Sequence, residues 1–445
     1  MHKLMHKLKE NKIILVSVLM SVTLSAIVCL GVCMHMDKNK YTMIATGSLY
    51  VNVQDFGARG DGKTDDTAAI VSAMKSYDGK GGIVWFPDGA YMFSNLVVPD
   101  NITLLMSDFD DYYEYTDPTK KVDMKCCLKR LDGSKGTAII NNGMLQNIMI
   151  NGNNVGSDVC VENYGRVDGL CVVRAYDAVL WKKGDIENLR LHGNKNDALI
   201  CEAVDHNLTN FNISSNANGM VFKDAATLRI TDGKVEWNGK NNILNAGNSA
   251  ELTFDDVFLD SANWYNIYST GNFYNVRFTN CTFIGSQRRL QTSPEKNYLS
   301  MFYFSNNSTG LVFDACYFRK YNMRGGNGSA KEQVKSLLTY QHEFVNQQPI
   351  IFSACINELP IRNKDDSPNL VYQLLGTADG NGADTTFVRG QKVVIGESST
   401  ADIKLKSDAT TGSLVYDWQR KKLLINLWGK WYDVLGNEPD KSYTN

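Results

Sequence analysis

A repeat of short apolar segments constrains the fold of this chain more than any other feature of its sequence. An Asn or Asp precedes each segment, and successive members of the series lie 21, 20, 22, 22, 23, 25 and 34 residues apart. The residues that carry the repeat are Asn147, Asp168, Asn188, Asn210, Asp232, Asp255, Asn280 and Asp314. A second series of apolar pairs runs in phase with the first, from Ile139-Ile140 to Phe302-Tyr303. Each period therefore holds two or three short strands without a helix between them.

This period predicts a parallel β-helix. Leucine-rich repeats share the period but require a consensus that is absent here, and propeller blades need about 40 residues. In a β-helix, equivalent residues of successive coils stack about 4.8 Å apart, so Asn or Asp side chains at a turn can hydrogen-bond along the stack. We therefore predict an all-β fold in which the Asn and Asp series lies at turns. The strand cysteines are then small core residues, and a bridge between Cys281 and Cys316 is not expected.

Composition excludes several classes of function. The formal net charge is −2, which gives no basic excess for binding nucleic acid. Ten cysteines in 445 residues are too few for a disulfide scaffold, and no C-x-x-C spacing suggests structural zinc. The sequence thus favours a globular repeat protein without a bound cofactor.

The first 40 residues are typical of an export segment. Residues 13–36 contain no charged side chain, and four lysines precede them against a single Glu10. The apolar run reaches the roughly 20 residues needed to span a bilayer. We interpret it as an uncleaved signal anchor, with a cleaved signal peptide or lipidation at Cys33 as alternatives. Each of these places the body outside the cytoplasm, attached to the membrane or secreted.

A Gly-rich segment opens the body. Residues 51–67 read as a strand and a Gly-rich turn that lead into a helix, and Gly81-Gly82-Ile83-Val84-Trp85-Phe86 forms a further strand. This segment resembles the amino-terminal cap of the pectate-lyase superfamily, in its rhamnogalacturonase and epimerase-like branch. The resemblance implies a single-stranded, right-handed parallel β-helix that acts on extracellular polysaccharide. In that fold, the carboxylates of Asp61, Asp65 and Asp66 are expected to be structural residues of the cap.

The expected domains are an anchor at 1–40, a β-helix at 48–360, and a linker with a small β module at 361–445. The module is predicted from apolar runs near residues 413–432, which contain Trp418, Trp428 and Trp431. These indoles are expected either to stack on sugars or to form the core of the module.

Charge gathers in three neighbouring coils at the ends of the second strand series. The candidate catalytic residues there are Lys182, Glu202, Asp205, His206, Lys223 and Asp224. Glu202 and Asp224 are expected to approach the roughly 5–5.5 Å separation of a retaining glycosidase, whereas Lys223 as a base would suit a lyase. The structural alternative is a Lys-Glu-Lys ladder of ion pairs on a solvated face. His192 with Glu236 is expected to be structural.

Substrate contacts are expected from Trp181 and from the loop arginines Arg288 and Arg289. An acidic insert at 108–117 offers a calcium site or a sugar-binding rim, although a solvated loop is the simpler interpretation.

The sequence therefore predicts a glycoside hydrolase or polysaccharide lyase, with a non-catalytic glycan-binding rod as the alternative. Its polygalacturonase-type motifs are incomplete, so the resemblance does not name the reaction. The expected partner is a polysaccharide, with anionic polysaccharides among the candidates. No cofactor is expected, except Ca²⁺ in the case of a lyase.

Overall fold

The computed structural model describes residues 50–107, 126–285, 300–304, 308–320, 336–340, 350–359, 372–375, 378–379, 396–398, 414–417, 421–427 and 430–433. Contacts divide the chain into two compact units, Met1–Val51 and Asn52–Asn445. The apolar segment 13–36 lies outside the described residues. Within the described ranges, no helix is long and apolar enough to cross a bilayer.

The Gly-rich segment forms a cap of short elements. These are β1 (Tyr50–Asn52), η1 (Val53–Phe56), β2 (Asp61–Asp65), α2 (Thr67–Lys75), β3 (Gly82–Phe86) and β4 (Gly89–Phe93). Helix α2 buries Ile70, Ala73 and Met74, the face that helical spacing predicts. Asp66 is 1% exposed and accepts the backbone N–H of Arg59 at 2.7 Å, which ties the Gly-rich turn to the start of the helix.

The two other cap carboxylates also bind backbone groups. Asp61 accepts the N–H groups of Lys63 and Thr64, and these bonds lower the pKa of Asp61 to about 2. Asp65 accepts the backbone N–H of Thr67 at 3.0 Å and its hydroxyl at 2.6 Å. All three carboxylates therefore hold the cap together, as predicted.

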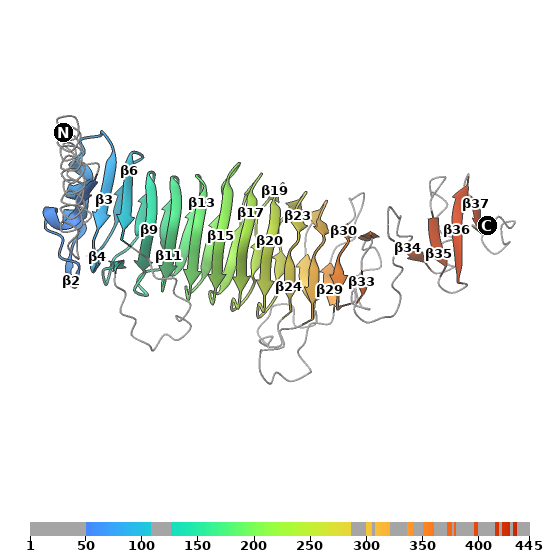
Figure 1. Cartoon of the computed structure of the whole chain (residues 1–445). Helices are drawn as coiled ribbons and strands as arrows, with labels where there is room; N and C mark the ends of the chain where they lie inside the picture. Colours follow the sequence, from blue (N-terminus) through green and yellow to red (C-terminus); the bar gives the residue numbers. More distant parts are fainter. Residues whose placement is uncertain are drawn as a thin grey trace, which may run out of the picture. The chain divides into compact units, whose positions relative to one another are not determined.

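After the cap the chain forms coils whose strands stack side by side in parallel sheets (Figure 1). One sheet has ten strands: β5 (Leu96–Val98), β8 (Ile139–Asn141), β10 (Val159–Asn163), β12 (Asp177–Trp181), β14 (Asp197–Cys201), β16 (Asn218–Phe222), β18 (Ile243–Asn245), β21 (Ile267–Ser269), β25 (Ser300–Phe304) and β29 (Ser336–Tyr340). We call this the ten-stranded sheet.

The larger parallel sheet continues the strands of the cap. Its further members are β6 (Ile102–Met106), β7 (Cys126–Arg130), β9 (Met144–Asn151), β11 (Arg166–Val173), β13 (Ile186–His192), β15 (Asn207–Ser214), β17 (Arg229–Glu236), β20 (Thr253–Asp260), β23 (Arg277–Thr279), β24 (Thr282–Ile284), β27 (Val312–Asp314), β28 (Tyr317–Arg319), β30 (Ile350–Ser353), β31 (Ile356–Asn357), β32 (Tyr372–Leu375) and β33 (Ala378–Asp379). A small third sheet joins β19 (Ser249–Ala250), β22 (Phe273–Tyr274) and β26 (Ser308–Thr309). The described coils thus form a parallel β-helix.

Part-way along the larger sheet, each coil bends at a residue with left-handed backbone. The φ angles are 52° at Asn147, 58° at Asn188, 52° at Asn210, 57° at Asp232 and 53° at Asn280. Asn and Asp adopt this conformation more readily than other residues with a Cβ. Five members of the predicted turn series are therefore confirmed.

For the other three members, the predicted position of the bend is wrong by one residue. The bend falls at Gly169, Asp256 and Ala315, with φ angles of 86°, 55° and 51°, instead of at Asp168, Asp255 and Asp314. Strand pairing sets the register, and it aligns Asp168 with Glu187 instead of with Asn188. The Asn188 amide still donates to Asp168 at 2.6 Å, and the Asn210 amide donates to Asn188 at 2.6 Å, so a side-chain ladder does form.

A second ladder of asparagines is buried at the corner where each coil passes from the larger sheet to the ten-stranded sheet. Its members are Asn194, Asn216, Asn238, Asn242 and Asn266, each at most 3% exposed. Each amide donates to the next, with distances of 2.9, 3.2, 2.9 and 2.7 Å along the series. Buried amides are tolerated because they are paired in this way.

We expect Asn216→Ala to lower the free energy of unfolding by about 2–3 kcal/mol, because it leaves buried donors and acceptors of its neighbours without partners. Asn216 accepts the backbone N–H of Asn194 at 3.0 Å and donates to the carbonyl of Leu191 at 3.1 Å. Guanidinium denaturation measures the change, and the exposed Asn142→Ala is the control. Equal midpoints for the two variants would contradict a stabilising role for the buried ladder.

The core inside the coils is apolar, and its later part is aromatic. Phe254, Phe278, Phe313 and Phe352 stack in succession, with ring centroids 4.6, 5.0 and 5.0 Å apart. Cys281, Cys316 and Cys355 lie in register in three coils as buried free thiols. The absence of a bridge between Cys281 and Cys316 agrees with the prediction.

A small sheet near the carboxy terminus contains the predicted meander. Its strands are β34 (Gly396–Ser398), β35 (Leu414–Asp417), β36 (Lys422–Leu427) and β37 (Lys430–Asp433), and the last three are antiparallel. Trp431 is 5% exposed, which supports the interpretation as core packing. Trp418 and Trp428 lie outside the described residues.

Candidate active site on the ten-stranded sheet

A row of polar residues lies in register at, or just before, the first residues of four successive strands of the ten-stranded sheet. The row consists of Asp177, Asp197, Asn218 and Asn241. Tyr265 is the next member, and its ring stacks on that of Tyr268 at a centroid distance of 5.3 Å. Asp177 and Asp197 are partly exposed, whereas Val179 and Leu199 in the same strands are fully buried. Because both carboxylates are partly exposed, a ligand can reach them.

Hydrogen bonds fix the two carboxylates. Asp177 accepts the side-chain amide of Asn196 at 2.8 Å and the backbone N–H of Asp197 at 2.9 Å, both on the same oxygen, Oδ1. Asp197 accepts the amide of Asn218 at 2.8 Å on its own Oδ1. Because one oxygen of each carboxylate is held, both side chains are oriented before any ligand arrives.

The pKa of Asp197 is raised above its ordinary value. Burial of the carboxyl is the main cause, and the neighbouring charge of Asp177 adds to it. The Asn218 amide and the ammonium groups of Lys223 and Lys240 act in the opposite direction without cancelling the shift. Two close carboxyls in different environments are typical of sites that perform acid–base chemistry.

Lysines and carboxylates follow at the other end of the same strands. Lys182 forms an ion pair with Glu202, which raises the pKa of the Lys182 ammonium. The hydroxyl of Tyr164 donates to Glu162 at 2.5 Å, and this bond raises the pKa of Tyr164. This end of the face can therefore hold both positive and negative groups of a ligand.

The predicted catalytic residues lie on one stack of turns that follows the ten-stranded sheet. Lys182, Glu202 and Lys223 come directly after residues that are paired in register. Asp205 is an exposed turn residue with a φ of 62°, and Asp224 accepts the backbone N–H of Asn248 at 3.2 Å. The structure thus places Lys182, Glu202 and Lys223 in register in three successive coils, with Lys182 and Glu202 in direct contact.

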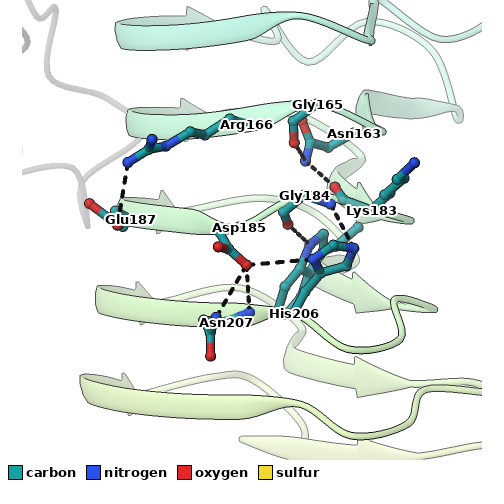
Figure 2. Close-up of polar contacts among 10 residues, drawn as sticks. Asn163, Gly165, Arg166, Lys183, Gly184, Asp185, Glu187, His206 and Asn207 are labelled. Carbon is teal, nitrogen blue, oxygen red and sulfur yellow. Dashed lines mark hydrogen bonds and ion pairs between the residues drawn. The ribbon is translucent and has the colours of Figure 1, made fainter.

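His206 braces this turn (Figure 2). The backbone N–H of Gly184 donates to its Nε2 at 3.0 Å, and its Nδ1 lies 3.5 Å from the carboxylate of Asp185. Asp185 in turn accepts the backbone N–H of Asn207 at 2.9 Å. Because Nε2 acts as an acceptor, a catalytic role for His206 would require this turn to open.

We expect His206→Ala to lower the free energy of unfolding by about 1–2 kcal/mol, since the N–H of Gly184 loses its acceptor. Thermal unfolding monitored by circular dichroism measures the change. His206→Gln retains an acceptor and is the matched control. Loss of turnover in His206→Gln at unchanged stability would support the catalytic role predicted from the sequence.

The expectation for Trp181 is wrong. Its side chain is fully buried inside the coil, and its indole N–H donates to the carbonyl of Gly184 at 2.6 Å. Trp181 pairs in register with Asn163 and Cys201, which also face the core. Its side chain therefore cannot touch a polysaccharide. Arg288 and Arg289 lie outside the described residues.

His192 and Glu236 lie in register in the larger sheet, with Ser214 between them. The His192 ring is 4% exposed, and its Nδ1 lies 2.8 Å from the hydroxyl of Ser214. This arrangement favours the structural interpretation. In the part of the chain that the structure describes, no group of three or more His, Cys, Asp or Glu side chains is placed to hold a metal ion. The acidic insert at 108–117 is outside that part.

Sequence reasoning missed Asp177 and Asp197, although a signal for them exists. Residues 177–181 read Asp-Ala-Val-Leu-Trp and residues 197–201 read Asp-Ala-Leu-Ile-Cys, so the acid begins the same short strand twice. The residues predicted to be catalytic follow the ends of these strands, whereas Asp177 and Asp197 are their first residues.

The stacked coils define a parallel β-helix protein, and its candidate site lies along the ten-stranded sheet. Residues 50–110 match the model of a family described as rhamnogalacturonase A/epimerase, pectate lyase-like. This match confirms, for residues 50–110, the resemblance to the pectate lyase-like family that was seen in the sequence.

Two curated relatives match part of the chain. A probable glucan endo-1,3-beta-glucosidase of Arthroderma benhamiae is 40% identical over 70 residues, which are 14% of this chain and 8% of that protein. Alginate lyase 7 of Azotobacter vinelandii is 54% identical over 44 residues, which are 10% of this chain and 5% of that protein. The chain therefore spans less than a tenth of the length of each of these relatives.

Among solved structures, the A-module of the mannuronan C-5 epimerase AlgE4 of Azotobacter vinelandii resembles this chain with a TM-score of 0.52 at 14% identity. The superposition covers 73% of this chain and 99% of the A-module. At this identity the likeness supports the fold alone.

Proposed function

We propose that this protein is an enzyme that cleaves a polysaccharide on the outer face of the ten-stranded sheet. One observation carries the proposal: Asp197, a partly buried carboxyl with a raised pKa, lies one coil away from Asp177. Relatives named for glucosidase and lyase activities agree with a carbohydrate substrate.

Hydrolysis suits this pair. Adjacent strands lie about 4.8 Å apart, close to the roughly 5–5.5 Å between the carboxyls of retaining glycosidases. The Asp197 carboxyl donates its proton to the glycosidic oxygen as the C–O bond breaks, and the Asp177 carboxylate bonds to the sugar carbon. Water, deprotonated by Asp197, then displaces Asp177 and restores both groups.

A uronate lyase is the second candidate, and Lys223 favours it. Lys223 follows the end of β16, and its ammonium opposes the rise in the pKa of Asp197, which begins β14. In that reaction a cation binds the uronate carboxylate, and a base removes the C5 proton while the linking oxygen leaves. Glu202 and Asp224 remain proposed participants in either reaction, and we propose Ca²⁺ only for the lyase.

We further propose that the body acts outside the cytoplasm and that residues 13–36 export or anchor it. Their uncharged, apolar run behind four lysines is the observation that supports this location.

The test incubates the protein with pectic, alginate-like and capsular polysaccharides. Reducing ends and the absorbance of unsaturated uronates are both followed, with Glu202→Gln and Lys223→Ala alongside the wild type. New reducing ends without absorbance establish a hydrolase, and absorbance that is lost in Lys223→Ala establishes a lyase. Binding without any cleavage would replace the enzyme by a glycan-binding rod.

Turnover is expected to fall as the pH rises through the raised pKa of Asp197, because the proton donor is then ionised. Folding stability should fall over the same pH range, since a folded-state pKa above the unfolded value favours folding only while the group is protonated. A pH–rate profile and pH-dependent denaturation measure the two effects. In Asp197→Asn the stability should no longer fall over this pH range. The same fall in the variant and in the wild type would contradict the assignment of the raised pKa to Asp197.

A further inference from the structure

An exposed tryptophan occupies a corner of the β-helix where the fold does not need one. Trp237 is 56% exposed and has a left-handed φ of 59°. The corresponding corners of the two neighbouring coils carry serines, Ser215 and Ser261, with φ angles of 60° and 50°. A large side chain in this conformation is unfavourable, and strain of this kind is concentrated at functional sites.

A second indole and a cation lie in the adjoining turns. The ammonium of Lys240 is 5.6 Å from the ring centroid of Trp264, and the backbone N–H of Trp264 donates to the carbonyl of Lys240 at 2.7 Å. Within the described part of the chain, the indole N–H of Trp264 has no acceptor. Lys240 therefore lies against Trp264 of the next coil, and Trp237 stands three residues before Lys240 in its own coil.

This group is continuous with the acid pair. Lys240 precedes Asn241, whose amide donates to Asn218 at 3.1 Å, and the amide of Asn218 donates to Asp197 at 2.8 Å. The strand of Asp197 follows the turn that contains the exposed Lys195, which adds a further cation to this edge. A polymer that lies over Asp197 can therefore extend to Trp237.

We propose that Trp237, Lys240 and Trp264 form a subsite for acidic polysaccharide beside the acid pair. The exposed face of Trp237 stacks on a pyranose ring, because indole offers a flat apolar surface. Lys240 pairs with a uronate carboxylate through a charge-assisted hydrogen bond. This inference rests on the proposed function and assigns it a substrate class, glycans that contain uronic acids.

Isothermal titration calorimetry on the full chain tests the subsite. The probes are hexamers of mannuronate, guluronate and galacturonate, with a neutral glucose hexamer for comparison. Trp237→Ser introduces the residue of the neighbouring corners and should preserve the fold. Lys240→Gln removes the cation, and Lys234→Gln is its matched control because Lys234 lies 5.9 Å from the ring of Phe258 in a similar pair elsewhere.

We expect at least one uronate hexamer to bind more tightly than the neutral one, and Trp237→Ser and Lys240→Gln each to weaken it about tenfold, with Lys234→Gln unchanged. Asp197→Asn should bind like the wild type while losing turnover. Wild-type affinity in Trp237→Ser and Lys240→Gln would overturn the subsite while leaving the enzyme proposal intact. Preference for the neutral hexamer would overturn the substrate class. Absence of both binding and cleavage in the wild type would overturn the proposed function together with the subsite.

Discussion

Asp197→Asn is expected to lower turnover of a susceptible polysaccharide by about 1,000-fold, the usual scale for loss of a general acid. The asparagine keeps the oxygen that accepts the amide of Asn218, so the side chain should remain in place. Because the substitution also removes the repulsion between Asp177 and Asp197, stability at neutral pH should be unchanged or higher. Steady-state kinetics and thermal unfolding on the same preparation separate the two effects.

Asp168→Asn is the matched control for this variant. Asp168 also accepts a side-chain amide from the next coil, that of Asn188 at 2.6 Å, but it belongs to the larger sheet. Its turnover should stay within a factor of two of the wild type. Equal activity of Asp197→Asn and the wild type would exclude Asp197 as the acid and would favour Glu202 as the catalytic carboxylate.

Phe313→Ala is expected to give the largest loss of stability, about 3–5 kcal/mol, because it opens a cavity in the aromatic core. The ring is fully buried and stacks between Phe278 and Phe352, with both centroids 5.0 Å away. It also meets Phe318 edge-on at 5.6 Å. Guanidinium denaturation followed by circular dichroism measures the change in unfolding free energy.

Ile356→Ala tests whether burial causes this effect. Ile356 lies on β31, in the coil after Phe313, and is 51% exposed. Its removal should change the unfolding free energy by no more than about 0.5 kcal/mol. A loss below about 1 kcal/mol in Phe313→Ala would show that the stacked rings do not form a close-packed core.

The turn series illustrates what a repeat reveals and where it fails. Asn147, Asn188 and Asn210 were found because their polar side chains recur with the period of the coil. Gly169 and Ala315 were missed because the bend requires a backbone conformation, and these residues have no polar side chain that would signal it. Strand pairing alone fixes which residue stands at the bend.

In the candidate site, too, the sequence predicted the positions of residues along the coils but not their contacts. The spacing of Lys182, Glu202 and Lys223 correctly placed them at equivalent positions of three coils. Their partners could not be inferred, since a hydrogen bond such as the one between Gly184 and His206 depends on how one turn rests on the next. Trp181 was misplaced for a related reason: alternation along a short strand does not say which face is the interior.

The sequence by itself determined the β-helix, its cap and the coils that carry charge, because period and Gly-rich turn chemistry are local properties of the chain. Only the tertiary structure decided the register, the buried asparagine ladder and the pairing of Asp177 with Asp197. Stacking brings residues 20 apart to within one strand spacing, and burial there raises the pKa of Asp197. Neither the distance nor the burial exists until the coils have stacked.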